Sequence, residues 1–438
     1  MSLNQKSGVD VQAISYVQMA PTLEYAANVT AQCIQSMVAL TKTPFPLNKL
    51  DIVGLIESGF RNPMDNFGLL TADSAEFGSS NFADNYDLAG QSVITCEGVA
   101  GQYFGGLVTP ERWGSEWLNI GISTYFAGVA ARDQLAPADE NILEAFVISE
   151  RGSAFEEMNY TGAPIVYNES RFDGVVQLGG SIVMRMLEGV VERQVFQQAI
   201  ASYLDDNQWG NARESDFFRA FETANGNQPL CGDLWITDFL WDFLYQSYFP
   251  VVKISFDPTA GYSFTQNSIN ADDTSTWNIP LFVWSEKTQK VKILWLLKDG
   301  GTCGSIQWDL DDRYIFNHRS RTFALFDYSL ALWGRLLSID YSVIDEVTQL
   351  GMIIDRQISE QFPRAPLPDS SILGRLLNKI LNDNYLVVSP FVVDYALMLF
   401  ENDTLEDQLF ELVNWSPATM RQDMINDFLL INVSRLLV

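Results

Sequence analysis

The sequence predicts a multidomain α+β protein whose parts follow one another along the chain. Its 438 residues are enough for two or three domains, and with 47% of them hydrophobic the chain can build sizeable cores. Helical and strand-like periods mix in the first half, short strand-like runs take over near residue 249, and a helical period returns near residue 328. We therefore expect domains at 1–248, 249–327 and 328–438.

The first part combines a few strands with many helices. Apolar residues at helical spacing predict helices, and short β-branched runs bounded by Gly, Pro or Asn predict strands. Pro250 ends the last helical pattern, since proline cannot continue a helix. The expected elements are helix 21–42, strands 50–56 and 68–77, a mainly helical stretch 88–225 that is clearest at 180–204, and helix 233–248.

The middle part has the pattern of a small β-sandwich. Its runs are short, rich in β-branched and aromatic residues, and separated by Gly, Asp and Asn turns. Helical periodicity then continues to residue 438, with a proline-containing break at 362–368. The expected strands are 251–256, 262–265, 279–284, 291–297, 305–310 and 322–326.

Charge and hydropathy exclude some classes of partner. The chain carries 27 Lys and Arg against 55 Asp and Glu, a net charge of −28, whereas nucleic-acid binding needs clustered cations. No run of about 18 apolar residues occurs, so the sequence predicts no membrane span. An apolar leader segment is not visible at the N-terminus either. The acidic surface keeps the protein soluble or steers cationic peptides towards it.

The four cysteines, Cys33, Cys96, Cys231 and Cys303, form no C-x-x-C pair that would indicate a zinc knuckle or redox site. They are either one or two disulfides of a secreted protein or buried free thiols. The chain also contains N-glycosylation sequons, which would favour an extracellular or cell-surface location and a glycoprotein. These sequons begin at Asn28, Asn159, Asn168, Asn402, Asn414 and Asn432.

The most informative motif is EGVAGQYFGGLVT at 97–109, followed by WLNIG at 117–121. It resembles the zinc-binding helices of the aminopeptidase N family of zinc metallopeptidases (gluzincins). That family carries H-E-x-x-H-Q-W-F-G-N-L-V-T and, after eighteen intervening residues, the Glu of W-L-N-E-G. The same interval separates Gly101 from Ile120. Further segments resemble the family in the same order: PFPLNKLD at 44–51, NPMDNFGLLT at 62–71, QLGG at 177–180, RML at 185–187 and TFALFDY at 322–328.

The resemblance implies a thermolysin-like catalytic-type domain at 1–248, followed by the β-sandwich and a truncated α-helical domain, with the family's usual N-terminal β domain absent. It implies substrate-binding roles for Met64, Asp65 and Asn66, with Asp65 at the position of the Glu that grips the substrate amine. The resemblance does not extend to the residues that bind zinc and catalyse the reaction. The matching positions place Glu97, Gly101 and Ile120 at the three zinc ligands, Gly98 at the general base, and Gln177 at the Tyr that stabilises the oxyanion.

Zinc sites need three or more His, Cys, Asp or Glu ligands, so the family's cofactor is not expected here. We expect Glu97 to be an isolated carboxylate in a cleft made roomier and drier by Gly98, Gly101 and Ile120. The alternative is a collapsed structural core. Shifting the motif by one residue to set Cys96-Glu97 against H-E does not help, because Ala100 then takes the second His position. His318, the single histidine, lies in the β region and is expected to be structural.

These observations predict a pseudoenzyme: an inactive aminopeptidase-like protein that retains a peptide- or protein-binding role. One alternative is an active metalloaminopeptidase that releases N-terminal residues with a non-standard zinc site built from Cys96, Glu97 and Asp65. Another is an interaction partner that associates with active members of the family.

Overall fold

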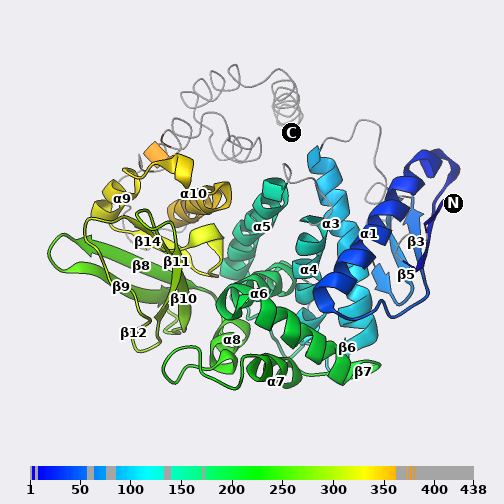
Figure 1. Ribbon diagram of the computed structural model, residues 1–438, viewed down its shortest axis with the longest axis horizontal. Helices are drawn as coiled ribbons and strands as arrows, with labels where there is room; N and C mark the ends of the chain where they lie inside the picture. Colours follow the sequence, from blue (N-terminus) through cyan, green and yellow to red (C-terminus); the bar gives the residue numbers. More distant parts are fainter. Residues whose placement is uncertain are drawn as a thin grey trace, which may run out of the picture.

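The computed structural model describes residues 2–4, 8–56, 64–74, 85–132, 140–169 and 173–361, and the single positions Ile372, Arg375, Leu376 and Lys379. The protein is a mixed α/β molecule. Figure 1 shows a small sheet at the N-terminal end, a central group of helices and a β-rich part at the opposite end. Within the described ranges, none of the helices combines the length and the hydropathy that crossing a membrane would need.

The N-terminal sheet has five strands in the order β1-β2-β3-β5-β4. β2, β3 and β5 are parallel, and β4 is an antiparallel edge strand. Burial alternates along β2 and β5 and along the first four residues of β3, and α1 (Leu23–Thr41) packs on the sheet. The strands are β1 (Ser2–Asn4), β2 (Asp10–Ile14), β3 (Lys49–Leu55), β4 (Met64–Asn66) and β5 (Leu69–Asp73).

The central part is mainly helical. α4 packs on both α3 and α6, and π-helical turns follow α3 (η2) and precede α6 (η5). A two-stranded pair, β6 with β7, joins the end of the first π-turn to the end of α6. The elements are α3 (Asn85–Gly101), η2 (Gln102–Leu107), β6 (Val108–Pro110), η3 (Glu116–Leu118), α4 (Ile120–Arg132), α5 (Glu140–Thr161), η5 (Val175–Gly179), α6 (Gly180–Asn207), β7 (Gly210–Ala212), α7 (Glu214–Ala224) and α8 (Ile236–Tyr245).

Two further sheets form the β-rich part, one in the order β14-β8-β9 and the other β12-β11-β10-β13. β10 is buried along its whole length, because side chains cover both of its faces. The strands are β8 (Pro250–Asp257), β9 (Gly261–Ser268), β10 (Ile279–Ser285), β11 (Val291–Leu296), β12 (Thr302–Cys303), β13 (Tyr314–Ile315) and β14 (Leu325–Tyr328).

The strand expected at 305–310 was wrong. Gly304 adopts φ +143°, and the chain after it runs as a loop to β13. Trp308 in this loop packs on Tyr262, with ring centroids 4.8 Å apart, and edge-on to Tyr314 at 5.0 Å. The apolar alternation that suggested a strand therefore arises from an aromatic loop that covers the sheet.

The last described part is helical, with α9 (Leu330–Leu336), η7 (Tyr341–Val343) and α10 (Glu346–Gln361) after the short turn η6 (His318–Ser320). His318 Nε2 lies 3.1 Å from Asp345 Oδ2, and the Thr348 hydroxyl donates to the same oxygen. Burial would raise the pKa of Asp345, but these bonds and the charges of His318 and Arg319 outweigh it and lower the pKa to about 2. Apart from the four single positions, the helices expected beyond residue 361 lie outside the described residues.

Candidate functional site

The side chains at the family's metal position form a hydrogen-bonded cluster centred on Glu97. Gln177 Nε2 donates to Glu97 Oε1 at 2.8 Å, and Thr124 Oγ1 lies 3.0 Å from the same oxygen. Thr124 Oγ1 is also 2.9 Å from the main-chain oxygen of Ile120, one turn earlier in α4. The expectation that Glu97 is an isolated carboxylate was therefore wrong: its Oε1 accepts from side chains of two other elements.

Close backbone contacts place these side chains together. Gly121 in α4 and Gly180 at the start of α6 approach so closely that a Cβ on Gly121 would lie 2.8 Å from the Cα of Gly180. Only glycine, which has no Cβ, allows this contact. The contact lets the π-turn η5, which contains Gln177, pack directly on α4. π-turns are rare in helices and frequent at functional sites.

The other degenerate positions supply no metal ligand. Gly98 and Gly101 are buried, and Ile120 is half-buried at the start of α4. Gly101 lies four residues after Glu97 and so faces the same side of α3. Of the three ligand positions, only Glu97 is of a type that binds zinc, and its Oε1 already accepts from Gln177. Across the described ranges, no three His, Cys, Asp or Glu side chains are grouped so that they could hold a metal ion. The residues present do not fit zinc.

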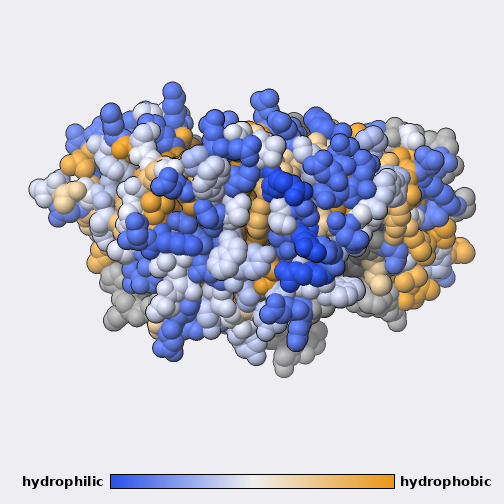
Figure 2. All heavy atoms as spheres, turned by 90° about the horizontal axis from the view of Figure 1, so that it is seen from below, coloured by the Kyte–Doolittle hydropathy of each residue, from blue (hydrophilic) through white to orange (hydrophobic). Residues whose placement is uncertain are grey.

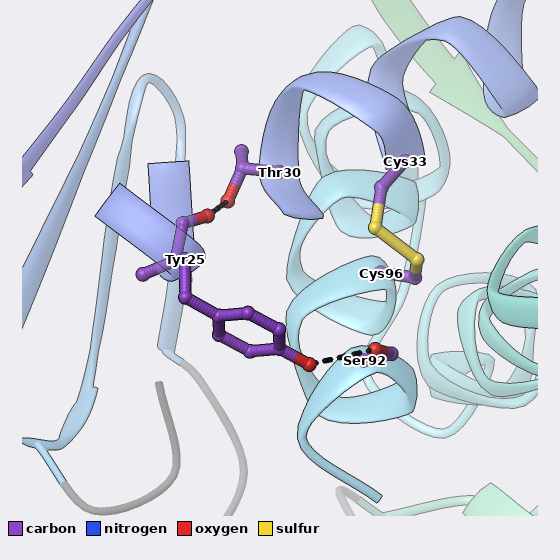
Figure 3. The surroundings of a disulfide bond; sticks show 6 residues. Tyr25, Thr30, Cys33, Ser92 and Cys96 are labelled. Atoms are coloured by element: carbon purple, nitrogen blue, oxygen red, sulfur yellow. Dashed lines mark hydrogen bonds between the residues drawn. A yellow bond between two sulfur atoms is a disulfide. The ribbon is translucent and has the colours of Figure 1, made fainter. Parts of the chain in front are cut away.

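The Cys96 thiolate of the alternative zinc set does not exist in this structure. Cys96 forms a disulfide with Cys33, with Cα atoms 5.2 Å apart, that joins α1 to α3 (Figure 3). One turn before Cys96 in α3, the Ser92 hydroxyl lies 3.3 Å from the hydroxyl of Tyr25 in α1. A disulfide sulfur is not the thiolate that binds metal, so this alternative loses its strongest ligand. The side chain of Asp65, its third member, lies outside the described residues.

The predicted substrate strand β4 lies beside this cluster and is held by Gln102. The amide of Gln102 accepts from the Gly68 N–H at 2.7 Å and donates to the Asn66 carbonyl at 3.3 Å. Gln102 is fully buried at the start of η2. Phe67 packs over Gly106 of the same turn, where a Cβ would lie 2.2 Å from the ring. The edge strand and the helix that bears Glu97 are therefore one connected unit.

The comparisons with known proteins match this arrangement. Residues 25–239 match the Peptidase family M1 domain. The chain is 26% identical to human "Glutamyl aminopeptidase" over 416 residues, 87% of this chain and 41% of that protein. It is 26% identical to "Putative aminopeptidase-2" of Caenorhabditis elegans over 336 residues, which cover 73% of this chain and 18% of that protein.

Residues 25–239 of the chain form a Peptidase family M1 domain. A third relative, "Tricorn protease-interacting factor F2" of Thermoplasma volcanium, is 25% identical over 289 residues, 63% of this chain and 35% of the relative. The chain thus spans between 18% and 41% of the length of these three relatives. The sequence resemblance to the aminopeptidase N family is confirmed.

Sequence reasoning missed one residue of the Glu97 cluster, Thr124, and the residue that anchors β4, Gln102. Thr124 stands four residues after Ile120, so helical spacing alone places it on the same face of α4. Gln102 belongs to the QYFGGLVT segment that indicated the family, but its role as an anchor for β4 depends on Gly68 and Asn66, over thirty residues earlier. The π-helical form of 102–107 and 175–179 had no signal in the apolar periodicity.

Proposed function

We propose that this chain is a catalytically inactive M1 aminopeptidase-like protein that binds a peptide or protein ligand without cleaving it. The observation that carries the proposal is the hydrogen bond from Gln177 to Glu97. It uses two positions that resemble a zinc ligand and the oxyanion stabiliser, and it joins them to each other instead of presenting them to a metal and a substrate.

The number of catalytic groups missing from the site supports inactivity. A catalytic zinc site uses three protein ligands and keeps a fourth position for water, and here only one of the three positions bears a ligand. Gly98 has no side chain to act as general base, and removing such a base typically costs about 10²–10⁴-fold in rate. The Gln177 amide lies where the family has a phenol, and an oxyanion donor is worth a further factor of about 10²–10³.

The proposed binding role is supported by the parts that remain. Met64 and Asn66 are exposed on the edge strand β4, and Gln102 fixes the backbone of that strand from the helix side. An exposed edge strand can accept an extended peptide by strand addition. We include Asp65 in this surface from its sequence position. The acidic chain, with its net charge of −28, favours a ligand with cationic groups.

We also propose that the chain has three parts. The change of element type at β8 and again after β14 supports a thermolysin-like part at 1–248, a β-sandwich at 249–327 and a helical part from 328. An oxidising compartment, and with it an extracellular or cell-surface location, is supported by the two disulfides, Cys33–Cys96 and Cys231–Cys303.

The test measures metal content and turnover in one preparation. The purified chain is incubated with zinc, freed of excess metal, analysed by mass spectrometry and assayed with an aminoacyl fluorogenic substrate. We expect far less than one zinc per chain and no chelator-sensitive turnover. Stoichiometric zinc with turnover that a chelator abolishes would refute inactivity.

Binding is tested separately. Titration calorimetry with basic peptides should detect binding that Gln102→Ala weakens, because that change releases the backbone of β4. Gln208→Ala removes an exposed amide that bonds only within its own turn, to Asp205, and is the matched control. Equal affinity of the two variants would refute the role of the edge strand.

A further inference from the structure

We propose that Trp209 and Phe67 form a binding site for a cationic side chain, lysine or arginine, of an extended peptide ligand. The site adds to the surface proposed above for the edge strand β4 and rests on that binding role. Neither residue occupies a position that matches a zinc ligand of the family. The site is therefore independent of whether the chain cleaves peptides.

The two rings form an exposed aromatic pair. Trp209 is 64% exposed and Phe67 is 42% exposed. The rings meet edge to face, with centroids 6.0 Å apart and an angle of 86° between their planes. Phe67 lies over the turn η2, where a Cβ on Gly106 would be 2.2 Å from its ring. The main chain of η2 thus supports the pair from one side, while much of Trp209 stays open to solvent.

The backbone of Trp209 is held in a strained conformation. Its φ of +63° lies in the left-handed region, which a bulky residue seldom adopts. The Trp209 N–H donates to the Leu107 carbonyl at 2.7 Å, and the next residue, Gly210, pairs with Val108 between β7 and β6. Burial of the indole does not compensate for the strain, because most of the residue is exposed. Strain that folding does not repay is typical of ligand-binding positions.

The charges beside the pair favour a cation. Asp206 lies three residues before Trp209, near the end of α6, and is exposed. In the part of the chain that the structure describes, its carboxylate has no hydrogen-bond or ion-pair partner. By contrast, Arg213, which follows β7, is already paired with Glu111. A negative charge without a counterion therefore lies within one turn of the aromatic pair.

The wider surface has the same character. Hydrophilic residues cover most of the underside of the molecule in Figure 2, the side on which β6 and β7 lie in Figure 1. The chain carries 55 acidic against 27 basic residues, so the field around it attracts cationic ligands.

A lysine or arginine side chain matches this combination better than an apolar one. The face of an indole attracts an ammonium or guanidinium group, and aromatic cages bind such cations between several rings. The aliphatic stem of the side chain can cover the rings while its charged end stays near water and the carboxylate. An apolar side chain would instead remove water from Asp206 without giving it a partner.

The position of the pair connects it to the edge strand. β4 ends at Asn66, so Phe67 is the next residue along the chain. Met64 on the same strand is 46% exposed. A peptide that adds to the open edge of β4 stays extended, with alternate side chains on each face. Such a peptide passes close to the aromatic pair, and its side chains there are the ones that the pair selects.

The experiment titrates two dye-labelled peptides with the full chain and follows fluorescence anisotropy. In one peptide lysine alternates with threonine, and in the other each lysine is replaced by norleucine, which keeps the aliphatic stem and removes the charge. We expect the unmutated chain to bind the lysine peptide at least about fivefold more tightly. Trp209→Leu should weaken binding of the lysine peptide by about fivefold, and Trp209→Phe should restore part of the loss, because it returns a ring face.

Two control variants separate the pair from its surroundings. Trp241→Leu is the matched control, since it removes a 49% exposed indole from another element, α8. Gln208→Ala removes the neighbour of Trp209, whose amide bonds back to Asp205 within its own turn. Each control should change the affinity for the lysine peptide by less than about twofold. Asp206→Asn, in contrast, should weaken that peptide and reduce the effect of salt on its binding.

Two results would overturn this site alone. One is an equal effect of Trp209→Leu and Trp241→Leu on the lysine peptide, which would mean that the acidic chain attracts cations without the aromatic pair. The other is equal affinity of the unmutated chain for the two peptides. In both cases the role of β4 stands if Gln102→Ala still weakens binding. If neither peptide binds the unmutated chain, the binding role and this site are refuted together.

Discussion

The hydrogen bond between Gln177 and Glu97 should be measurable as a coupling in stability. A hydrogen bond to a charged group contributes about 1.5–3 kcal/mol when buried. Glu97 and Gln177 are both half-buried, so screening by water reduces this figure, and we expect about 1–2 kcal/mol. Gln177→Ala and Glu97→Ala should each lower the free energy of unfolding, and the double variant should cost less than their sum.

The assay is urea unfolding of the four proteins of this double-mutant cycle at neutral pH, followed by circular dichroism. Thr124→Val, which keeps the shape and removes the hydroxyl, tests the second donor to Glu97 in the same way. Gln208→Ala is the control, since its exposed amide bonds to Asp205, and it should change the free energy by less than about 0.5 kcal/mol. Additive effects of the two site variants, within about 0.3 kcal/mol, would refute a cross-link through Glu97.

Other predictions concern single contacts. Replacing Cys33 and Cys96 together by Ala opens a loop with a sequence separation of 63, and should lower the free energy of unfolding by about 4 kcal/mol in non-reducing urea titrations. Gly121→Ala should cost about 1–3 kcal/mol because its Cβ would meet the backbone of α6, whereas Gly334→Ala, with nothing within 4 Å, should be neutral or stabilising by up to about 1 kcal/mol in the same titrations. Asp345 has a folded pKa of about 2, below its ordinary 3.8, so its stabilisation of about 2 kcal/mol is present above pH 3.8 and is lost as pH falls through 2. Acid titrations of Asp345→Asn should lack that loss, and an unchanged profile would contradict it.

The sequence predicted the elements better than their contacts. Helix 180–204 appears as α6 and strand 50–56 as β3, each within a few residues, because long helical periods and β-branched runs are strong local signals. The run at 305–310 failed, because alternation in an aromatic loop is indistinguishable from a strand until the ring partners are known. The pairing of Cys33 with Cys96 was beyond the sequence for the same reason: it depends on which helices meet.

The family resemblance assigned Glu97 and Gln177 to one site from the sequence. The two residues lie 80 positions apart along the chain and are joined by a hydrogen bond. What spacing cannot supply is the rotamer that turns the Gln177 amide onto Glu97, or the glycine contact that brings its turn near α4. Two polar side chains can bond to one another only if their backbones come close enough, and packing sets that distance.

The close contact of Gly121 with Gly180 bears on how such a centre persists. A metal ion ordinarily holds together the helices that supply its ligands, and removal of the ion loosens their packing. Here the two helices already touch backbone to backbone, and Glu97 accepts hydrogen bonds from two polar side chains. On the function proposed above, these contacts hold the region together without an ion, so its geometry would not depend on the supply of zinc.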